Sequence, residues 1–292
     1  MNVSIGINPI TWSNDDMQNV GADNSLEDCL SGASQAGYAG VELGHKFPRD
    51  PATLKPVLEA HSLALVSGWY SGQLLQRDAD AEIAAMQSHV ELLKAMGSDV
   101  LIFAEVSGCI HSDRHKRLSQ RPRLAASDWP GFCERLNTVA KACADHGLKL
   151  CFHHHMGTVV QSEDDIDRLM QSTSAAMHLL LDTGHALFAG ADPVVLATRY
   201  ADRIGHLHCK DVRSTILHRL QNRDCSFLDA VLAGVFTVPG DGCIDYDAVF
   251  SALRAADYRG WVVVEAEQDP SVAPPNHFAT LGFNNLQELT AG

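Results

Sequence analysis

Carboxylate and imidazole side chains recur at the ends of short apolar runs in this sequence, and their types suit metal binding and proton transfer. The firmest examples are Asp182, His208 and Glu265, which lie at or near the ends of runs rich in Val, Ile or Leu. Such groups are unfavourable to bury together unless a cation or mutual pairing compensates the lost hydration. Mixed oxygen and imidazole donors suit Mn, Co, Zn or Fe, so the pattern predicts a divalent metal site.

The triplet His153-His154-His155 follows another apolar run. Side chains alternate between the two faces of a strand, so His153 and His155 share one face and His154 takes the other. We therefore predict that His153 is the fourth metal ligand, that His155 acts in catalysis, and that His154 is structural.

The same alternation in the segment HLHCKD, residues 206–211, places His208 and Lys210 on the interior-facing side of a strand, together with His206. Lys210 then acts as a general acid or a substrate clamp, or forms a structural ion pair with a nearby carboxylate. His185 belongs to the sequence Asp-Thr-Gly-His, which is either part of a site or a polar strand end that runs into a glycine turn.

The elements that must position these residues alternate along the chain, apolar runs with helical segments, as expected for βα units around a parallel sheet. The runs predicted to be strands are residues 3–8, 39–43, 64–69, 99–104, 149–153, 177–182, 203–209 and 260–265. Helices are predicted in segments that include residues 25–35, 81–96, 129–146, 164–172 and 246–256. This order predicts an α/β fold, a (β/α)₈ TIM barrel, as a single domain over residues 1–292.

Active sites of such barrels lie at the rim formed by the carboxyl ends of the strands. We expect the polar side chains at the ends of the apolar runs to meet at that rim. Two connections, residues 106–130 and 212–245, are much longer than usual, and we expect them to build or cover the site.

Composition and charge restrict the partners. Apolar residues make up 46% of the 292 residues, which provides material for one large core. The formal net charge of −14 opposes binding to nucleic acid and to anionic membrane surfaces. The sequence shows neither a secretory signal pattern nor the run of ~18 apolar residues that a spanning helix needs. We therefore expect a cytoplasmic protein with reduced cysteines and a small-molecule substrate, without nucleic-acid or membrane partners, and compatible with a homo-oligomer.

The motifs at these positions resemble those of the xylose-isomerase-like barrel superfamily. The match consists of a histidine or acid after the fifth strand, Asp-x-x-His after the sixth, His-x-His-x-Lys-Asp on the seventh and Glu after the eighth. Within that superfamily the chain resembles the inosose dehydratases nearly from end to end. The markers are GINPITWSNDD at 6–16, KFPRDP at 46–51, SGWYS at 67–71, FHHHMGT at 152–158, LDTGH at 181–185 and SFLDAVLAGVFTVPGDG at 226–242.

The resemblance implies a hydro-lyase of inositol catabolism that removes water from a polyhydroxylated ketone, 2-keto-myo-inositol, and gives a trihydroxycyclohexanedione through an enolate. It also implies Mn²⁺ or Co²⁺ as the bound metal, ahead of Zn²⁺, Fe²⁺ or Mg²⁺. Two residues depart from the family pattern. His153 stands where many superfamily members place a glutamate ligand, and His45 stands where the inosose dehydratases have asparagine.

Such a β-elimination needs a base for the carbon-bound proton and an acid for the departing hydroxyl. The predicted catalytic residues, with the two roles left unassigned, are His155, His185, Lys210 and Glu267. Other side chains lie at strand ends or just beyond and offer hydrogen-bonding groups or an apolar wall. These predicted substrate contacts are Asn8, Glu42, Trp69 and Arg213.

Other functions fit the same barrel. A sugar or polyol-ketone epimerase or isomerase shares metal-assisted enolisation and differs only in the fate of the enolate. A metal-dependent endonuclease for damaged DNA needs a basic groove, which the net charge of −14 opposes. A barrel without catalysis, used as an interaction module, predicts no bound metal.

Overall fold

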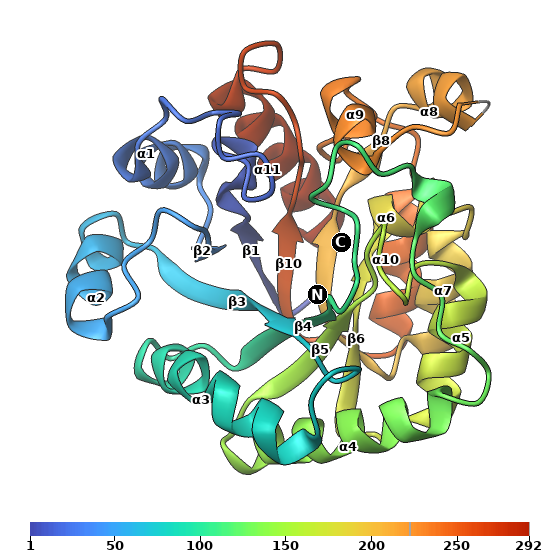
Figure 1. Cartoon of the computed structure of the whole chain (residues 1–292). Coiled ribbons are helices and arrows are strands. Elements are labelled where there is room, and N and C mark those ends of the chain that lie inside the picture. Colours follow the sequence, from blue (N-terminus) through green and yellow to red (C-terminus); the bar gives the residue numbers. More distant parts are fainter. Residues whose placement is uncertain (222, 292) are drawn as a thin grey trace.

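A closed barrel of parallel strands forms the centre of the computed structural model, which describes residues 1–221 and 223–291. Hydrogen-bonded neighbours follow the order β1-β10-β7-β6-β5-β4-β3-β2, so the sheet closes on itself (Figure 1). The barrel strands are β1 Val3–Ile7, β2 Gly40–Leu43, β3 Ala64–Gly72, β4 Val100–Glu105, β5 Lys149–His153, β6 Met177–Asp182, β7 Ile204–Cys209 and β10 Gly260–Val264. The predicted (β/α)₈ barrel is confirmed, and every predicted run overlaps one of these strands, although β3 and β4 extend beyond the carboxyl ends of their predicted runs. Residues 222 and 292 of the predicted single domain lie outside the described residues.

Most helices lie on the outside of the barrel (Figure 1). The helices are α1 Leu26–Ala36, α2 Pro51–Ala60, α3 Ala79–Ala95, α4 Trp129–Asp145, α5 Glu163–Ser172, α6 Thr183–Phe188, α7 Pro193–Tyr200, α8 Ser214–Gln221, α9 Phe227–Leu232, α10 Tyr246–Ala255 and α11 Pro275–Ala291, with the 3₁₀ helices η1 Pro9–Thr11 and η2 Leu118–Gln120. Local sequence sets their ends: α1 begins with a reciprocal pair of hydrogen bonds between Ser25 and Asp28, and it ends on Gly37 at φ 105°, which glycine adopts without strain. In the described part of the chain, no helix combines the length and the apolar composition needed to cross a membrane.

The interior face of the barrel changes from apolar to polar toward the carboxyl ends of the strands. On β6, Leu180 belongs to a small apolar cluster inside the barrel, and Asp182 is the next residue on that face. On β5, Cys151 belongs to the same cluster and is followed by His153. The outward-facing residues, such as Leu207, pack into the main core between the sheet and the helices. This gradient places ionisable groups at one end of the barrel over an apolar floor.

The long connection after β7 folds over that end. It contains a two-stranded antiparallel ribbon, β8 Asp211–Val212 with β9 Phe236–Thr237, and the helices α8 and α9. Its apolar side chains form a second cluster with Met17 and Met156 from other loops. The Phe227 ring centroid lies 5.1 Å from that of His155. The expected covering of the site by residues 212–245 is therefore observed.

Candidate active site

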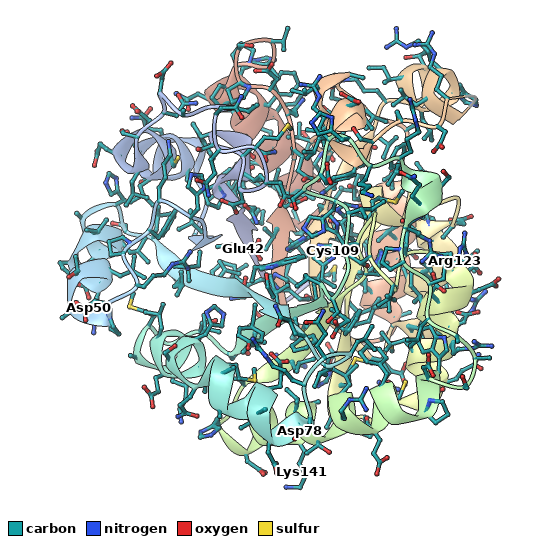
Figure 2. All side chains as sticks on the ribbon, in the orientation of Figure 1. Glu42, Asp50, Asp78, Cys109, Arg123 and Lys141 are labelled. Carbon is teal, nitrogen blue, oxygen red and sulfur yellow. The ribbon has the colours of Figure 1, made fainter. Side chains whose placement is uncertain are left out.

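A cavity of about 280 Å³ is lined by residues at the carboxyl ends of the barrel strands and in the loops beyond them. Its polar lining residues are Asn8, Asp15, Asp16, Glu42, His45, Arg49, Trp69, Ser71, His111, His153, His155, His208, Glu265 and Glu267. Figure 2 shows Glu42 inside the molecule, whereas Asp50 and Lys141 lie at its edge. The volume is close to the lower limit of the roughly 300–1,000 Å³ of small-molecule pockets. The cavity therefore suits a small polar ligand.

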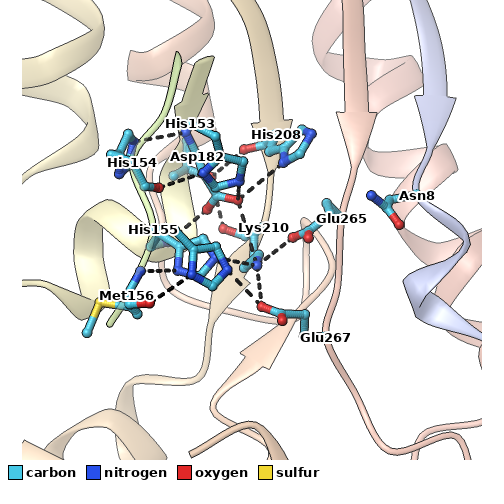
Figure 3. Close-up of polar contacts among 12 residues, drawn as sticks. Asn8, His153, His154, His155, Met156, Asp182, His208, Lys210, Glu265 and Glu267 are labelled. Atoms are coloured by element: carbon cyan, nitrogen blue, oxygen red, sulfur yellow. Dashed lines mark hydrogen bonds and ion pairs between the residues drawn. The ribbon is translucent and has the colours of Figure 1, made fainter. Parts of the chain in front are cut away.

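Three of the four predicted metal ligands come together beside this cavity, which His153 and His208 line. Asp182 Oδ2 lies 3.4 Å from His208 Nδ1 and 3.7 Å from His153 Nε2 (Figure 3). All three residues are buried, and Asp182 Oδ2 and His208 Nδ1 receive no hydrogen bond from any described residue. One ligand atom from each residue lies within 4.8 Å of the others, a spacing that one cation can bridge. This group therefore fits a divalent metal ion.

Hydrogen bonds orient the two histidines of this group. His153 Nδ1 donates to the carbonyl oxygen of His154 at 2.6 Å, so its Nε2 keeps a lone pair on the side of Asp182. His208 Nε2 lies 3.2 Å from Glu42 Oε1, which turns Nδ1 toward Asp182. Metal-binding histidines commonly donate their other ring N–H to a carbonyl or carboxylate in this way. His154, predicted to be structural, accepts a hydrogen bond at Nε2 from the backbone N–H of Asp182.

Glu42 is buried among hydrogen-bond donors. Its Oε1 accepts from His206 Nε2 at 2.8 Å as well as from His208, and its Oε2 accepts from Asn8 Nδ2 at 2.7 Å. Burial raises the pKa of Glu42, but His208 and His206 outweigh burial and hold it well below its usual value. Burial lowers the pKa of His208, but the carboxylates of Glu42 and Asp182 raise it to about 10. A metal ion that binds here must therefore displace a proton from His208.

A second cluster, centred on Lys210, lies beside this group. Lys210 Nζ lies 2.5 Å from both Glu265 Oε2 and Glu267 Oε2, and 3.0 Å from His185 Nε2 (Figure 3). Burial lowers the pKa of Lys210, but Asp182, Glu265 and Glu267 outweigh it and raise that pKa above its usual value. Burial, together with the neighbouring Glu267 and Asp182, raises the pKa of Glu265 to about 8 against the opposing effect of Lys210. Glu265, the remaining predicted metal ligand, thus contacts Lys210 in this structure.

The predicted catalytic residues differ in their access to the cavity. His155 and Glu267 line it, whereas the side chains of His185 and Lys210 are 1% and 0% exposed. His155 Nδ1 donates to the carbonyl oxygen of Met156 at 2.8 Å, which leaves a lone pair on Nε2. Burial lowers the pKa of His155 well below its usual value, so the ring is unprotonated at neutral pH. His155 is placed to accept a proton, and His185 and Lys210 are placed to position Glu267.

The predicted substrate contacts divide in the same manner. Three of them line the cavity: Asn8, Glu42 and Trp69. Arg213 does not join them, because its guanidinium binds Asp241 Oδ2 at 2.7 Å and lies over the Phe278 ring at 5.5 Å. Arg213 directly follows the short ribbon strand β8, and the ribbon directs its side chain toward Asp241 and Phe278. Arg213 therefore lies outside the set of residues that line this cavity.

Loops supply cavity residues that the sequence analysis did not place in the site. These are Asp15, Asp16, His45, Arg49 and His111. His45 Nδ1 lies 2.5 Å from Asp15 Oδ1, and His111 Nε2 lies 3.5 Å from Asp16 Oδ1. Two adjacent acids in the marker GINPITWSNDD, shortly after the first strand, were an available signal for Asp15 and Asp16. His111 lies in the connection 106–130, which was expected to build or cover the site, and it does line the cavity. No local motif singles out this residue within that connection.

Comparison with known proteins agrees with this geometry. The family described as xylose isomerase-like TIM barrel matches residues 30–284. The inosose dehydratase of Geobacillus thermodenitrificans (strain NG80-2) is 40% identical over 288 residues, which cover 98% of this chain and 97% of that protein. This chain belongs to the inosose dehydratase family of xylose isomerase-like TIM barrels. The resemblance predicted from the motifs is confirmed.

Other relatives extend the comparison. The rhizopine catabolism protein MocC of Rhizobium meliloti is 47% identical over 291 residues, which cover 100% of this chain and 90% of that protein. The solved structure of the IolI protein with a bound zinc atom has a TM-score of 0.66 at 16% identity, covers 98% of this chain and 96% of that chain, and shows a shared fold. As a member of the inosose dehydratase family the protein is an enzyme, and its predicted class, hydro-lyase, is confirmed.

Proposed function

We propose that this enzyme removes water from 2-keto-myo-inositol and forms a trihydroxycyclohexanedione. The observation that carries the proposal is the 40% identity to an inosose dehydratase along 98% of this chain. The cavity of about 280 Å³ supports it, because the polar side chains in its lining offer hydrogen-bonding partners for the hydroxyl groups of one small ring.

We further propose that His153, Asp182 and His208 hold a divalent metal ion, with Mn²⁺ or Co²⁺ as first choices. The unbonded atoms Asp182 Oδ2 and His208 Nδ1 support this assignment. Glu265 lines the same cavity and completes the proposed ligand set. When bound, such an ion acts as a Lewis acid toward the ketone oxygen and stabilises the negative charge that develops as the neighbouring C–H bond breaks.

The chain's own residues bind the ring and move protons. The Trp69 ring lies 5.4 Å from the His153 ring and 5.7 Å from the His155 ring, between centroids, and forms an apolar wall beside both. His155 Nε2 takes the proton from the carbon next to the ketone, because its Nδ1 is committed to a backbone carbonyl. Phe227 packs against His155 and limits the access of water to it.

Mass spectrometry of the reaction mixture tests the proposal. Metal-loaded protein should convert 2-keto-myo-inositol to a product that is lighter by one water, and chelator-treated protein should not. An epimerase or isomerase gives a product of unchanged mass with altered stereochemistry. That result, obtained with the metal-loaded protein, would overturn the dehydratase assignment.

A second candidate substrate comes from the relative named for rhizopine catabolism, which is 47% identical to this chain. Its name places that protein in a different catabolic route, so a rhizopine-derived compound is the competitor to test. The ratio of kcat/KM for 2-keto-myo-inositol to kcat/KM for that compound decides between them. A ratio above one supports the inosose assignment.

A further inference from the structure

Asp16 is a cavity residue to which the proposed dehydration has given no task. It lies in the connection between η1 and α1 and lines the cavity together with His155 and Glu267. Its side chain is 22% exposed, and Oδ1 lies 3.5 Å from His111 Nε2. Asp16 and His155 therefore border the same cavity.

The loop around Asp16 is held in place by specific contacts. Asn14 Oδ1 accepts hydrogen bonds from the backbone N–H groups of Asp16 at 2.8 Å and Met17 at 2.6 Å. Met17 is buried in the second apolar cluster, and Lys46 donates to the carbonyl oxygen of Ala22 at 3.0 Å farther along the loop. These contacts anchor the loop on both sides of Asp16. A group fixed in this way is preorganised for a defined role.

Asp16 has no lysine or arginine in ion-pair contact among the described residues, although Arg49 lines the same cavity. Among the described residues, its carboxylate has one ion-pair contact, with His111, and burial lowers the pKa of that imidazole to about 4, so the ring is neutral. Burial, together with the carboxylates of Glu267 and Asp15, raises the pKa of Asp16 to about 7, against a smaller attraction to Lys210. Asp16 therefore holds a proton in a large share of molecules at neutral pH, unlike a surface aspartate.

Asp16 and His155 line the same cavity and differ in what they offer a ligand there. His155 Nδ1 donates to the carbonyl oxygen of Met156, so Nε2 is left to accept a proton, whereas the carboxyl group of Asp16 can hold one. Two other carboxyl groups of the cavity, Glu265 and Glu267, are less available because the fully buried Lys210 binds both.

Resting on the proposed dehydration, we infer that Asp16 is the general acid that protonates the departing hydroxyl. His155 Nε2 takes the proton from the carbon next to the ketone, and the C–H electron pair forms the carbon–carbon double bond of an enolate, with the negative charge on the former ketone oxygen. The enolate then re-forms the ketone, and its electron pair forms a double bond to the following carbon, whose C–O bond breaks as the hydroxyl takes the Asp16 proton and leaves as water. The resulting enol becomes the dione, and the proton on His155 returns through solvent to Asp16. Asp16 is thus a catalytic residue that the strand-end pattern does not reveal.

Asp16→Asn separates the two half-reactions. In deuterated water, a general-acid role predicts that the variant still exchanges the hydrogen next to the ketone in recovered 2-keto-myo-inositol, while its kcat for dehydration falls by about 10²–10⁴-fold. Metal content and the Tm should stay at the wild-type values. Asp23→Asn, the same change at an exposed position of the same loop, should leave both reactions unchanged.

Several outcomes overturn the inference. Unchanged dehydration by Asp16→Asn removes Asp16 from the reaction, and loss of exchange together with dehydration makes it the base or a positioning residue instead. A wild-type enzyme that neither exchanges nor dehydrates the ketone contradicts the proposed function itself, which is a separate result. The pH profile of the wild type needs no variant: kcat/KM should fall as pH rises through about 7, where Asp16 loses its proton. A profile without this limb also overturns the inference.

Discussion

Two neighbouring groups of buried charges in this site differ in what neutralises them. Around Lys210, one ammonium lies 2.5 Å from the carboxylates of Glu265 and Glu267. Around Asp182, the basic atoms that face Oδ2 stand 3.4–3.7 Å away, and no described residue donates a hydrogen bond to it. A buried anion without a close partner is unfavourable. The Lys210 cluster contains its own cation, the ammonium of Lys210. The Asp182 group, which consists of His153, Asp182 and His208, has unbonded polar atoms that a metal ion can bind.

This difference bears on how many metal ions the site takes. His155, His185 and Glu267 also place potential ligand atoms within 4.8 Å of one another. Two of these residues already contact Lys210, with His185 Nε2 at 3.0 Å and Glu267 Oε2 at 2.5 Å. The lysine therefore occupies the position that a second ion needs. We expect one metal ion per chain, held by the Asp182 group.

Asp182→Asn should have the largest effect on metal binding. Asparagine keeps an acceptor for the backbone N–H of His185, which Asp182 Oδ1 binds at 2.8 Å, so the start of α6 should survive. The charge that faces His153 and His208 is lost. Metal affinity should fall by more than the roughly 10–100-fold typical of outer-shell changes. Calorimetric titration with Mn²⁺ or Co²⁺ measures this, and wild-type affinity in a folded variant would remove Asp182 from the ligand set.

Lys210→Met should mainly affect stability. It leaves the carboxylates of Glu265 and Glu267 buried without their cation, which costs about 3–5 kcal/mol for a broken buried pair. The pKa of Glu265 is about 8 with the lysine present, and removing the lysine raises it further. A carboxyl group whose pKa is raised in the folded state contributes stability at low pH, and this contribution is lost as the pH rises through the raised pKa. The loss of unfolding free energy caused by Lys210→Met should therefore grow with pH. Urea unfolding below and above that pKa checks the trend, and a deficit that shrinks with pH contradicts it.

Glu42→Gln should weaken the Asp182 group indirectly. The carboxylate of Glu42 accepts from His208 Nε2 and orients the ring, and loss of such a partner typically lowers metal affinity about 10–100-fold. Glutamine is nearly isosteric and retains one acceptor oxygen, so the barrel should stay folded. Metal titration of the variant is the measurement. If metal affinity is unchanged and only KM rises, Glu42 acts on substrate alone.

Arg213→Lys should have the smallest effect on the site, because Arg213 belongs to neither group of charges. Its guanidinium binds Asp241 and the carbonyl oxygen of Gly234 at 2.8 Å, which ties the β8–β9 ribbon together. Lysine loses the forked geometry, so unfolding free energy should fall by about 1–2 kcal/mol. Metal affinity and KM should remain within about twofold of wild type, and a large rise in KM would restore Arg213 as a substrate contact.

Strand positions were predictable because a buried parallel strand needs a continuous apolar run. Every predicted run overlaps a barrel strand, and alternation on β7 correctly separated His206 and His208 from Leu207. The β8–β9 ribbon was not predicted, because its strands are two residues long and carry no periodic signal. The contacts of Arg213 with Asp241 and Phe278 could not be predicted for the same reason, because nothing in the sequence shows that the chain forms a ribbon there.

The site was predictable in part. Side chains at barrel strand ends, such as His153, Asp182 and His208, meet because a closed parallel barrel brings the carboxyl ends of its strands together around one opening. Asp16 and His111 come from loops whose course depends on tertiary contacts such as the packing of Met17. Which carboxylates pair with Lys210 also depends on distances that sequence alone does not give.

The most direct test combines metal titration and product analysis on one sample. Metal-free wild-type protein is titrated with Mn²⁺ or Co²⁺ and assayed with 2-keto-myo-inositol at each point, beside Asp182→Asn. Our account predicts that loss of water rises in proportion to bound metal, saturates at one ion per chain, and is absent in the variant. Dehydration at the full rate by the chelator-treated wild type, or by metal-free Asp182→Asn, would contradict it.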